Sequence, residues 1–478
     1  MKNKIILGYD VMTYNGEQPN CLNPKFLNTI YNASDFYFSD SLEFFTKRWN
    51  TNWVLYNSNM YNNFGEKKSI YNIIEDKKAG INYEWFYIVE PFANLENFFG
   101  NDKFYNEFCL ENISKKALNE IVKGNGKLLI NYVIDGGTAF RVENFEKIIK
   151  FTKDNNIPDE KVYFVFADFK LKDNLKRLNV NYKVIDYSYN MISKGQEFYN
   201  TINNPNYSYW GAGSFEPQFG TIEHRKNSVT TSAEFLESIG KEKKDFLLLN
   251  RHWKLHRLLL LSQLHKLGFE KSLVSWDKQF SYQLDKDLFL MHDDNEEFLK
   301  LITETSSLLD INDLTKIAGF GFENKEIYLN TYLSIVTESV YFQEHNDFPS
   351  GYLSEKIWKP IGHCQPFILA GPSKSLEHIR ERFGYKTFHP YIDESYDMEE
   401  DDLKRLKMIQ IEIDKFANKT KEEKDGFLNN VKDICVYNQN LFLEYAKNSW
   451  NYINHNKEMQ LILNFLLDGQ MELIKSII

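Results

Sequence analysis

The sequence predicts an α/β protein built from two Rossmann-like units, each with a parallel β-sheet. Short apolar runs alternate with amphipathic stretches along the first part of the chain, and the same alternation returns after a turn-rich interval. Buried strands joined by crossover helices form parallel sheets. A third observation is residues 350–361, which follow a strand-like run ending in Glu338 and precede a second strand at 366–372. Ligands of doubly wound sheets bind beside such strand ends.

The first unit is expected to span residues 1–215. Its candidate helices include 114–123 and 142–155, where apolar residues recur at helical spacing. Its candidate strands are apolar runs between them, at 4–9, 53–56, 85–89, 127–134, 162–167 and 182–187.

The second unit is expected to span residues 245–445, after a connection at 216–244. Before that connection, Asn203-Asn204-Pro205-Asn206 and Trp210-Gly211-Ala212-Gly213 mark turns and break the alternation. The predicted elements are strand 245–250, helix 255–267, strand 273–276, an irregular acidic insertion at 277–330, and strands 333–337 and 366–372. Residues 446–478 are predicted to be helical.

Composition restricts the classes of function. The net charge of −10 disfavours a nucleic-acid partner without excluding a local basic cleft, because such partners need phosphate neutralisation. The four cysteines lie far apart without a CxxC pair, which argues against disulfide scaffolds and structural zinc. No apolar run reaches the ~20 residues of a membrane span, and the N-terminal apolar run is too short for a signal peptide. We therefore expect a cytoplasmic protein.

A basic segment follows the strand at 245–250. Up to five potential cations lie between Arg251 and Arg257, including Lys254 and His256, where the helix 255–267 begins. A helix N-terminus disfavours cations, so their presence makes sense if an anion also binds there. The alternative is a solvated basic turn. We favour the anion site, since the segment lies at the carboxyl end of a strand.

The segment 350–361 is expected to be a loop that leads into the start of a helix at Tyr352–Lys356, and it offers complementary groups. Tyr352 could stack on a base or ribose, Glu355 could accept bonds from ribose hydroxyls, and Lys356 could neutralise a phosphate. The alternative is a capping box in which Ser354 lies near the N-cap and Glu355 helps in the first turn.

With these segments in place, residues 245–390 resemble the donor-binding domain of the α1,3-fucosyltransferase family, glycosyltransferases of the GT-B type. The matching segments are Phe246–Arg257, Val336-Thr337-Glu338-Ser339, Tyr352-Leu353-Ser354-Glu355-Lys356 and Gln365–Ser373. The chain also resembles uncharacterised phage and bacterial glycosyltransferase-like proteins. One motif of the fucosyltransferases, Gly-Glu-Asn after an N-terminal strand, is absent, and its nearest counterpart is 132–137.

The resemblance implies two Rossmann-like domains facing a cleft and an inverting transfer of a sugar, GDP-fucose-like as first choice, to a glycan or other hydroxyl acceptor. It implies no metal or other cofactor, and C-terminal helices that pack back on the first domain. By the same resemblance Arg257 and Lys356 would hold the diphosphate, with Arg251 or Lys254 assisting. Glu355 would then hold the ribose, Tyr352 would lie beside the base or ribose, and Glu338 would face the donor sugar.

A general base is expected at a strand end of the first unit. Asp135 is the first candidate, although capping of its Asp-Gly turn is an almost equal explanation. Glu90 is the second and Asp168 the third. The Asp-x-Asp at 285–287 lies in the acidic insertion and is interpreted as a solvated loop, not a metal site.

Two other functions stay open. One is a phage-type transferase that glycosylates hydroxymethylated DNA bases, which a basic groove would favour. The other is a non-catalytic nucleotide-binding module, which would lack a carboxylate facing the donor. An oxidoreductase is disfavoured because no G-x-G-x-x-G follows the first strand, and an ATPase because no P-loop lysine motif is present.

Overall fold

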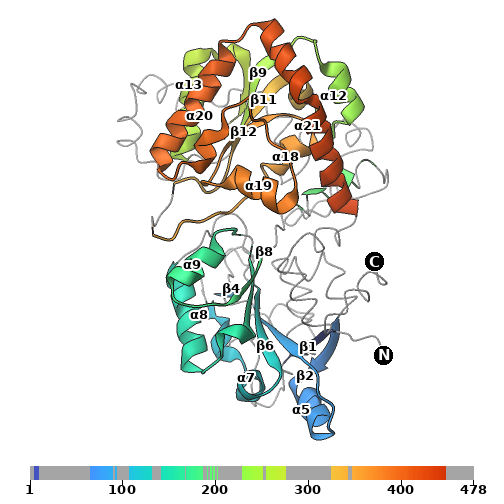
Figure 1. Ribbon diagram of the computed structural model, residues 1–478, viewed down its shortest axis with the longest axis vertical. Coiled ribbons are helices and arrows are strands. Elements are labelled where there is room, and N and C mark those ends of the chain that lie inside the picture. The colour runs from blue at the N-terminus through green and yellow to red at the C-terminus, as the bar shows by residue number, and fades with distance from the viewer. Residues whose placement is uncertain are drawn as a thin grey trace, which may run out of the picture. The chain divides into compact units, whose positions relative to one another are not determined.

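The computed structural model describes residues 5–9, 65–89, 92–93, 107–131, 142–166, 168–186, 229–250, 254–275, 325–342 and 347–447, together with residues 191, 194, 195, 198, 199 and 202. These residues separate into two compact units (Figure 1). The first lies within Met1–Tyr189 and Asp347–Pro349, and the second within Asn190–Asn346 and Ser350–Tyr452.

The described part of the first unit contains a six-stranded sheet in which all neighbouring strands are parallel. Its strands are β1 (Ile5–Tyr9), β2 (Gly65–Ser69), β3 (Trp85–Val89), β6 (Gly126–Asn131), β7 (Val162–Phe166) and β8 (Lys183–Asp186). Their order is β2-β1-β3-β6-β7-β8. The winding therefore reverses between β1 and β3, as in doubly wound sheets. Two short strands, β4 (Phe92–Ala93) and β5 (Glu107–Phe108), form a separate antiparallel pair.

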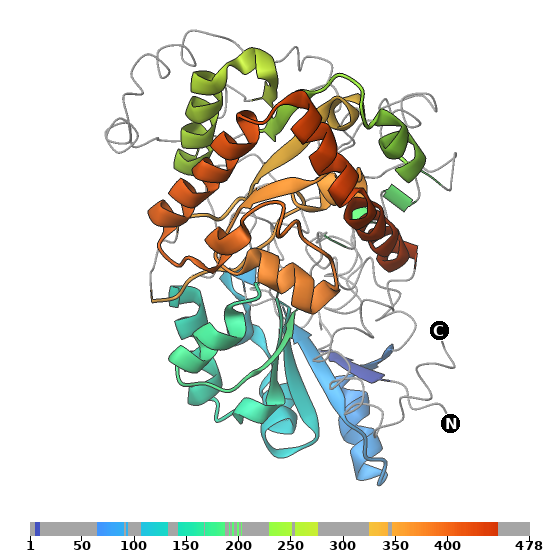
Figure 2. The same ribbon diagram turned by 45° about the horizontal axis from the view of Figure 1, so that its top comes forward.

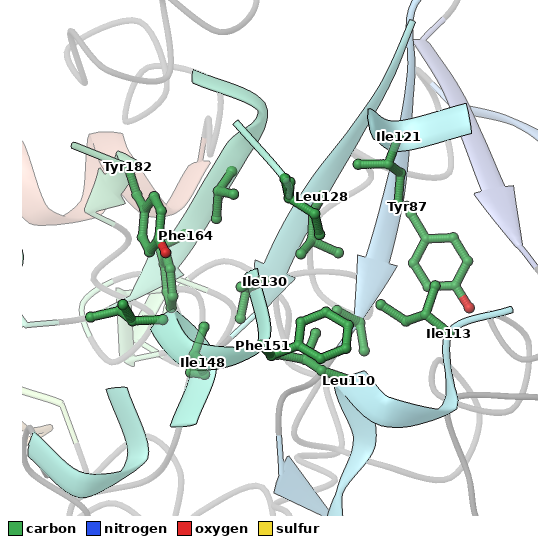
Figure 3. Packing of buried hydrophobic residues seen from close by; sticks show 14 of the residues in the cluster. Tyr87, Leu110, Ile113, Ile121, Leu128, Ile130, Ile148, Phe151, Phe164 and Tyr182 are labelled. Carbon is green, nitrogen blue, oxygen red and sulfur yellow. The ribbon is translucent and has the colours of Figure 1, made fainter. Parts of the chain in front are cut away.

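One face of this sheet packs against helices. These helices are α5 (Ile70–Lys78), α7 (Lys115–Lys123), α8 (Val142–Asp154) and α9 (Leu171–Arg177). The core between sheet and helices is apolar and includes Tyr87, Ile121, Leu128, Ile130, Ile148, Phe151 and Phe164 (Figure 3). The strand positions alternate because successive side chains of a strand point to opposite faces. The N-terminus of α7 forms where the hydroxyl of Ser114 accepts a hydrogen bond from the Ala117 amide.

The described part of the second unit contains a four-stranded parallel sheet. Its strands are β9 (Lys244–Leu249), β10 (Ser272–Ser275), β11 (Thr331–Thr337) and β12 (Phe367–Ala370), in the order β10-β9-β11-β12. Every residue of β11 and β12 is buried, as expected for strands covered on both faces. Here the winding reverses between β9 and β11.

Helices cover both faces of this second sheet. Both views show α13 (Leu255–Leu267) and α20 (Asp402–Ala417) on one side, and α12 (Ser232–Ser238) and α21 (Lys421–Lys447) on the other (Figures 1 and 2). The remaining helices are α17 (Lys325–Leu329), α18 (Trp358–Gly362) and α19 (Ser375–Phe383), and α18 packs against α21. The buried indole of Trp358 stacks with Phe442 at a centroid distance of 6.4 Å.

The predicted α/β class with parallel sheets is confirmed. The helix expected at 255–267 has those bounds, and most predicted strands agree within a residue or two. One expectation is wrong: residues 352–356 do not begin a helix, because α18 begins only at Trp358. Strand β2 was not predicted. The expected strand at 53–56, the end of the strand at 127–134, most of the insertion at 277–330 and residues 448–478 lie outside the described residues.

Candidate functional site

The carboxyl ends of β9 and β11 define the candidate site. These strands are neighbours, and the winding reverses between them. Ligands of open α/β sheets bind outside the strand ends at such a point. A hydrogen bond of 2.6 Å from Thr337 Oγ1 to Asn250 Oδ1 joins the two strand ends.

Glu338 follows β11 and is fully buried. Its Oε2 accepts hydrogen bonds from the amide of Ser354 at 2.9 Å and from the Ser354 hydroxyl. Its Oε1 has no hydrogen-bond partner among the described residues. Burial raises the pKa of Glu338, against the lowering effects of the Lys356 charge and the Ser354 bonds. The carboxyl group thus fixes the segment 350–356 to the end of β11.

Two lysines meet at Ser339, the next residue. Lys254 Nζ donates to the Ser339 carbonyl oxygen at 2.5 Å, and Lys356 Nζ donates to Ser339 Oγ at 3.1 Å. They come from different loops, one before α13 and one before α18. Lys356 Nζ also contacts Ser354 Oγ at 3.2 Å and Glu355 Oε1 at 2.8 Å, with its side chain 25% exposed. The fold therefore brings two ammonium groups to one position at the strand ends.

Glu355 is held in its ionised form. Burial alone would raise its pKa, but the charges of Lys356 and Lys359 and the hydrogen bond from Lys356 lower the pKa to about 2. Tyr352, three residues before it, is buried. The predicted ligand-binding residues Tyr352, Glu355 and Lys356 thus share one loop, but not one helix.

Arg257 lies in the first turn of α13 and is buried. Its Nη2 donates to the carbonyl oxygens of Thr337 at 3.3 Å and Glu338 at 3.2 Å. Burial lowers its pKa to about 10, although Glu338 and Glu355 act in the opposite direction. Its guanidinium therefore supports the end of β11 in this structure.

His256 was counted among the potential cations, and the structure corrects this. The side chain is buried, and desolvation and the neighbouring charges of Arg257 and Lys254 hold its pKa well below the usual range. Its Nε2 lies 3.1 Å from the Glu338 carbonyl oxygen. The imidazole is therefore neutral and donates from Nε2.

Further residues that the sequence did not suggest support these loops. The ring of Tyr341 stacks on His256 at 4.8 Å, and the Arg405 guanidinium lies 4.7 Å from the Tyr341 centroid. Arg405, from α20, donates to the carbonyl oxygens of Gly371 at 3.2 Å and Tyr341 at 3.4 Å. It thereby joins the loops after β11 and β12. Of the residues that support these loops, Ser354 alone was suggested by the sequence, as a candidate helix N-cap.

The predicted general bases belong to the first unit. Asp135 and Glu90 lie outside the described residues, as does Arg251 of the second unit. Asp168 is described and buried, and its Oδ1 accepts a hydrogen bond of 2.8 Å from the Lys170 amide. Its carbonyl oxygen accepts another of 3.1 Å from Leu171, so Asp168 shapes the turn into α9.

Over the described ranges no group of His, Cys, Asp and Glu side chains is arranged to hold a metal ion. Within the same residues no helix combines the length and apolar character needed to cross a membrane. No model of a known protein family matches the chain, and no curated protein matches it.

Proposed function

We propose that the chain is a glycosyltransferase of the GT-B type whose second unit binds a nucleoside-diphosphate sugar. The observation that carries the proposal is the meeting of Lys254 and Lys356 at Ser339, where the winding of the sheet reverses. A diphosphate bound beside Ser339 would meet positive charge from two separate loops.

The chemistry expected of such a site is the stabilisation of a leaving nucleoside diphosphate. Negative charge develops on the diphosphate as the bond to the sugar breaks, and two ammonium groups can stabilise it without a metal. The ionised Glu355 is suited to accept hydrogen bonds from ribose hydroxyls, with Tyr352 in the same loop. Arg257 already donates to the carbonyl oxygens of Thr337 and Glu338, so we assign the phosphates to the lysines first.

The acceptor would be the hydroxyl group of a glycan or of another molecule, and a GDP-fucose-like donor is the first choice. A carboxylate must take the proton of the attacking hydroxyl. Asp135 and Glu90 remain the candidates in the first unit. In the second unit, Glu338 directly precedes Ser339, the residue that both lysines contact.

Thermal unfolding with a panel of nucleotides tests the donor site. GDP, UDP, ADP, CMP and their sugar conjugates are compared in EDTA and in Mn²⁺. One nucleotide should raise Tm equally in both, and Lys356→Ala should abolish the shift. Lys407→Ala removes the same charge from the exposed side of α20 and should keep the shift. If no nucleotide raises Tm of the wild-type protein, the proposed donor site is wrong.

A nucleotide-binding module without catalysis is the second candidate. It is favoured by the complete burial of Glu338 and by its engagement with Ser354. An activity assay distinguishes the transferase from the non-catalytic module. The sugar conjugate of the nucleotide that raises Tm is incubated with excess protein and a mixture of glycan acceptors. Release of the nucleoside diphosphate above the rate without protein supports the transferase, and tight binding without release supports the module.

A further inference from the structure

The N-terminus of α19 resembles a phosphate site but is already filled. The helix follows β12 after Gly371-Pro372-Ser373-Lys374, and a strand, a glycine-containing loop and a helix N-terminus commonly bind phosphate in α/β folds. Here the amide of Leu376 donates to Asp397 Oδ1 at 2.8 Å, and the amide of Glu377 donates to Oδ2 at 2.9 Å. The two carboxylate oxygens of Asp397 therefore occupy the position at the N-terminus of α19 where a phosphate would bind.

Asp397 is held there by its own segment, η5 (Glu394–Met398). Its carbonyl oxygen accepts a hydrogen bond of 2.6 Å from the Lys374 amide, and its side chain is buried. The neighbouring Tyr396 hydroxyl accepts a hydrogen bond of 3.3 Å from Leu369 in β12. Glu394 accepts one of 3.2 Å from Arg380 in α19 itself. Displacing Asp397 would therefore break contacts to both the strand and the helix.

A second carboxyl group lies against the same loop. A Cβ atom built on Gly371 would lie 3.4 Å from Glu338 Cγ and 3.4 Å from Ser375 Oγ, at the first residue of α19. A phosphate approaching this helix would thus meet Asp397 directly and Glu338 close by. Negative charges at such separations repel. The cations of the strand ends, Lys254 and Lys356, lie instead at Ser339.

We propose that Asp397 is the built-in anion of α19 and excludes external phosphate from this helix, so that the phosphates of a nucleotide are bound by Lys254 and Lys356. The first half of this inference concerns the fold alone. The second half rests on the proposed function, and the two halves are tested separately.

Anion rescue tests the first half. Asp397→Ala leaves the amides of Leu376 and Glu377 without their acceptor, so the variant should unfold at a lower temperature than the wild-type protein. Sulfate should then recover most of that loss in a saturable manner. Asp393→Ala is the matched control, because Asp393 is exposed and caps only η5 through the Ser395 amide. Sulfate should not recover the stability of this control.

Asp397→Ser provides a second variant if Asp397→Ala does not fold, since a serine hydroxyl can still accept one amide bond. The same sulfate titration applies to it. If sulfate stabilises the Asp397 variants no more than it stabilises Asp393→Ala, α19 does not present an anion site and the inference is wrong.

Calorimetry with inorganic pyrophosphate tests the second half. The wild-type protein should bind one pyrophosphate, Lys356→Ala should lose it, and Lys407→Ala should retain it. Asp397→Ala should gain a second site and leave the first unchanged. A stronger single site in Asp397→Ala would mean that pyrophosphate competes with Asp397, which overturns the inference. Absence of any binding to the wild-type protein would instead contradict the proposed function, while sulfate rescue still decides the role of Asp397.

Discussion

Replacing Ser354 by alanine should destabilise the second unit by about 2 kcal/mol, the usual scale for a hydrogen bond to a charged group. The hydroxyl of Ser354 is completely buried and donates to Glu338 Oε2. Alanine removes this donor and leaves the carboxyl group with the Ser354 amide alone. The other oxygen, Oε1, has no hydrogen-bond partner among the described residues, so the lost bond is not replaced by another one there.

A matched control isolates the effect of charge. Ser375 is also buried, but its hydroxyl donates to a neutral acceptor, the Pro372 carbonyl oxygen, at 2.6 Å. Ser375→Ala should therefore cost about 1 kcal/mol. With roughly 2–4 °C per kcal/mol for a unit of this size, Tm should fall by about 4–8 °C for Ser354→Ala and about 2–4 °C for Ser375→Ala.

Urea unfolding at several pH values provides the assay. Protonation of Glu338 turns the charge-assisted bond into a neutral one of roughly half the strength. The cost of Ser354→Ala should therefore shrink towards that of Ser375→Ala as the pH falls through the raised pKa of Glu338. Equal costs for the two variants at every pH would refute the reasoning, because they would show that Ser354 does not donate to a carboxylate.

Three further predictions concern charged groups that are buried or partly buried. Lys424→Met leaves Asp245, its partner at 2.6 Å, buried without a counter-charge, and should lower the free energy of unfolding by about 3–5 kcal/mol in urea. Lys161→Met removes an ammonium group that donates to three carbonyl oxygens at the end of α7, at 2.7, 3.1 and 2.7 Å. Faster hydrogen exchange in α7 and a loss of about 2 kcal/mol should follow, and unchanged exchange would contradict the assignment. Burial raises the pKa of Glu338 above the usual range of a glutamate, so the folded state binds the proton more tightly than the unfolded state does and loses stability as the pH rises from the usual pKa to the raised one. Glutamine does not titrate, so Glu338→Gln lacks this pH dependence. The free energy of unfolding of Glu338→Gln, relative to that of the wild-type protein, should therefore increase with pH, and a constant difference would argue against the raised pKa.

The sequence predicts those parts of the fold that depend on local pattern. The helix Leu255–Leu267 and the strand Lys244–Leu249 were predicted because both are rich in leucine. An element that is buried in the core can be recognised from the length of its apolar run. The strand β2 escaped prediction because its sequence, Gly-Glu-Lys-Lys-Ser, has no apolar residue. Among the described strands it lies at the edge of the sheet and pairs with β1, and charged side chains are tolerated at such an edge.

The candidate site shows where local patterns fail. Residues 352–356 have the composition of a helix start, with Ser354 in the position of a cap. The hydroxyl of Ser354 instead donates to Glu338, which lies 16 residues earlier in the sequence, directly after β11. Likewise no local pattern could show that Asp397 caps α19 or that Arg405 joins the loops after β11 and β12. These contacts depend on which segments the fold brings together, and local sequence patterns do not show this.

The two carboxyl groups of the site are pushed in opposite directions by their surroundings. The pKa of Glu355 is lowered to about 2 by its lysine neighbours, whereas burial raises that of Glu338. Paired carboxyl groups that differ in this way commonly divide into a permanently charged group and a proton carrier. Glu355 therefore suits binding, and Glu338 suits proton exchange only if its Oε1 becomes accessible. Its other oxygen, Oε2, is bonded to the amide and the hydroxyl of Ser354, so freeing the whole carboxyl group requires the segment 350–356 to move, and with it the Lys356 ammonium group. Proton exchange at Glu338 and phosphate binding at Lys356 would then be coupled through one loop, and the bond from Ser354 would set the free energy of that coupling.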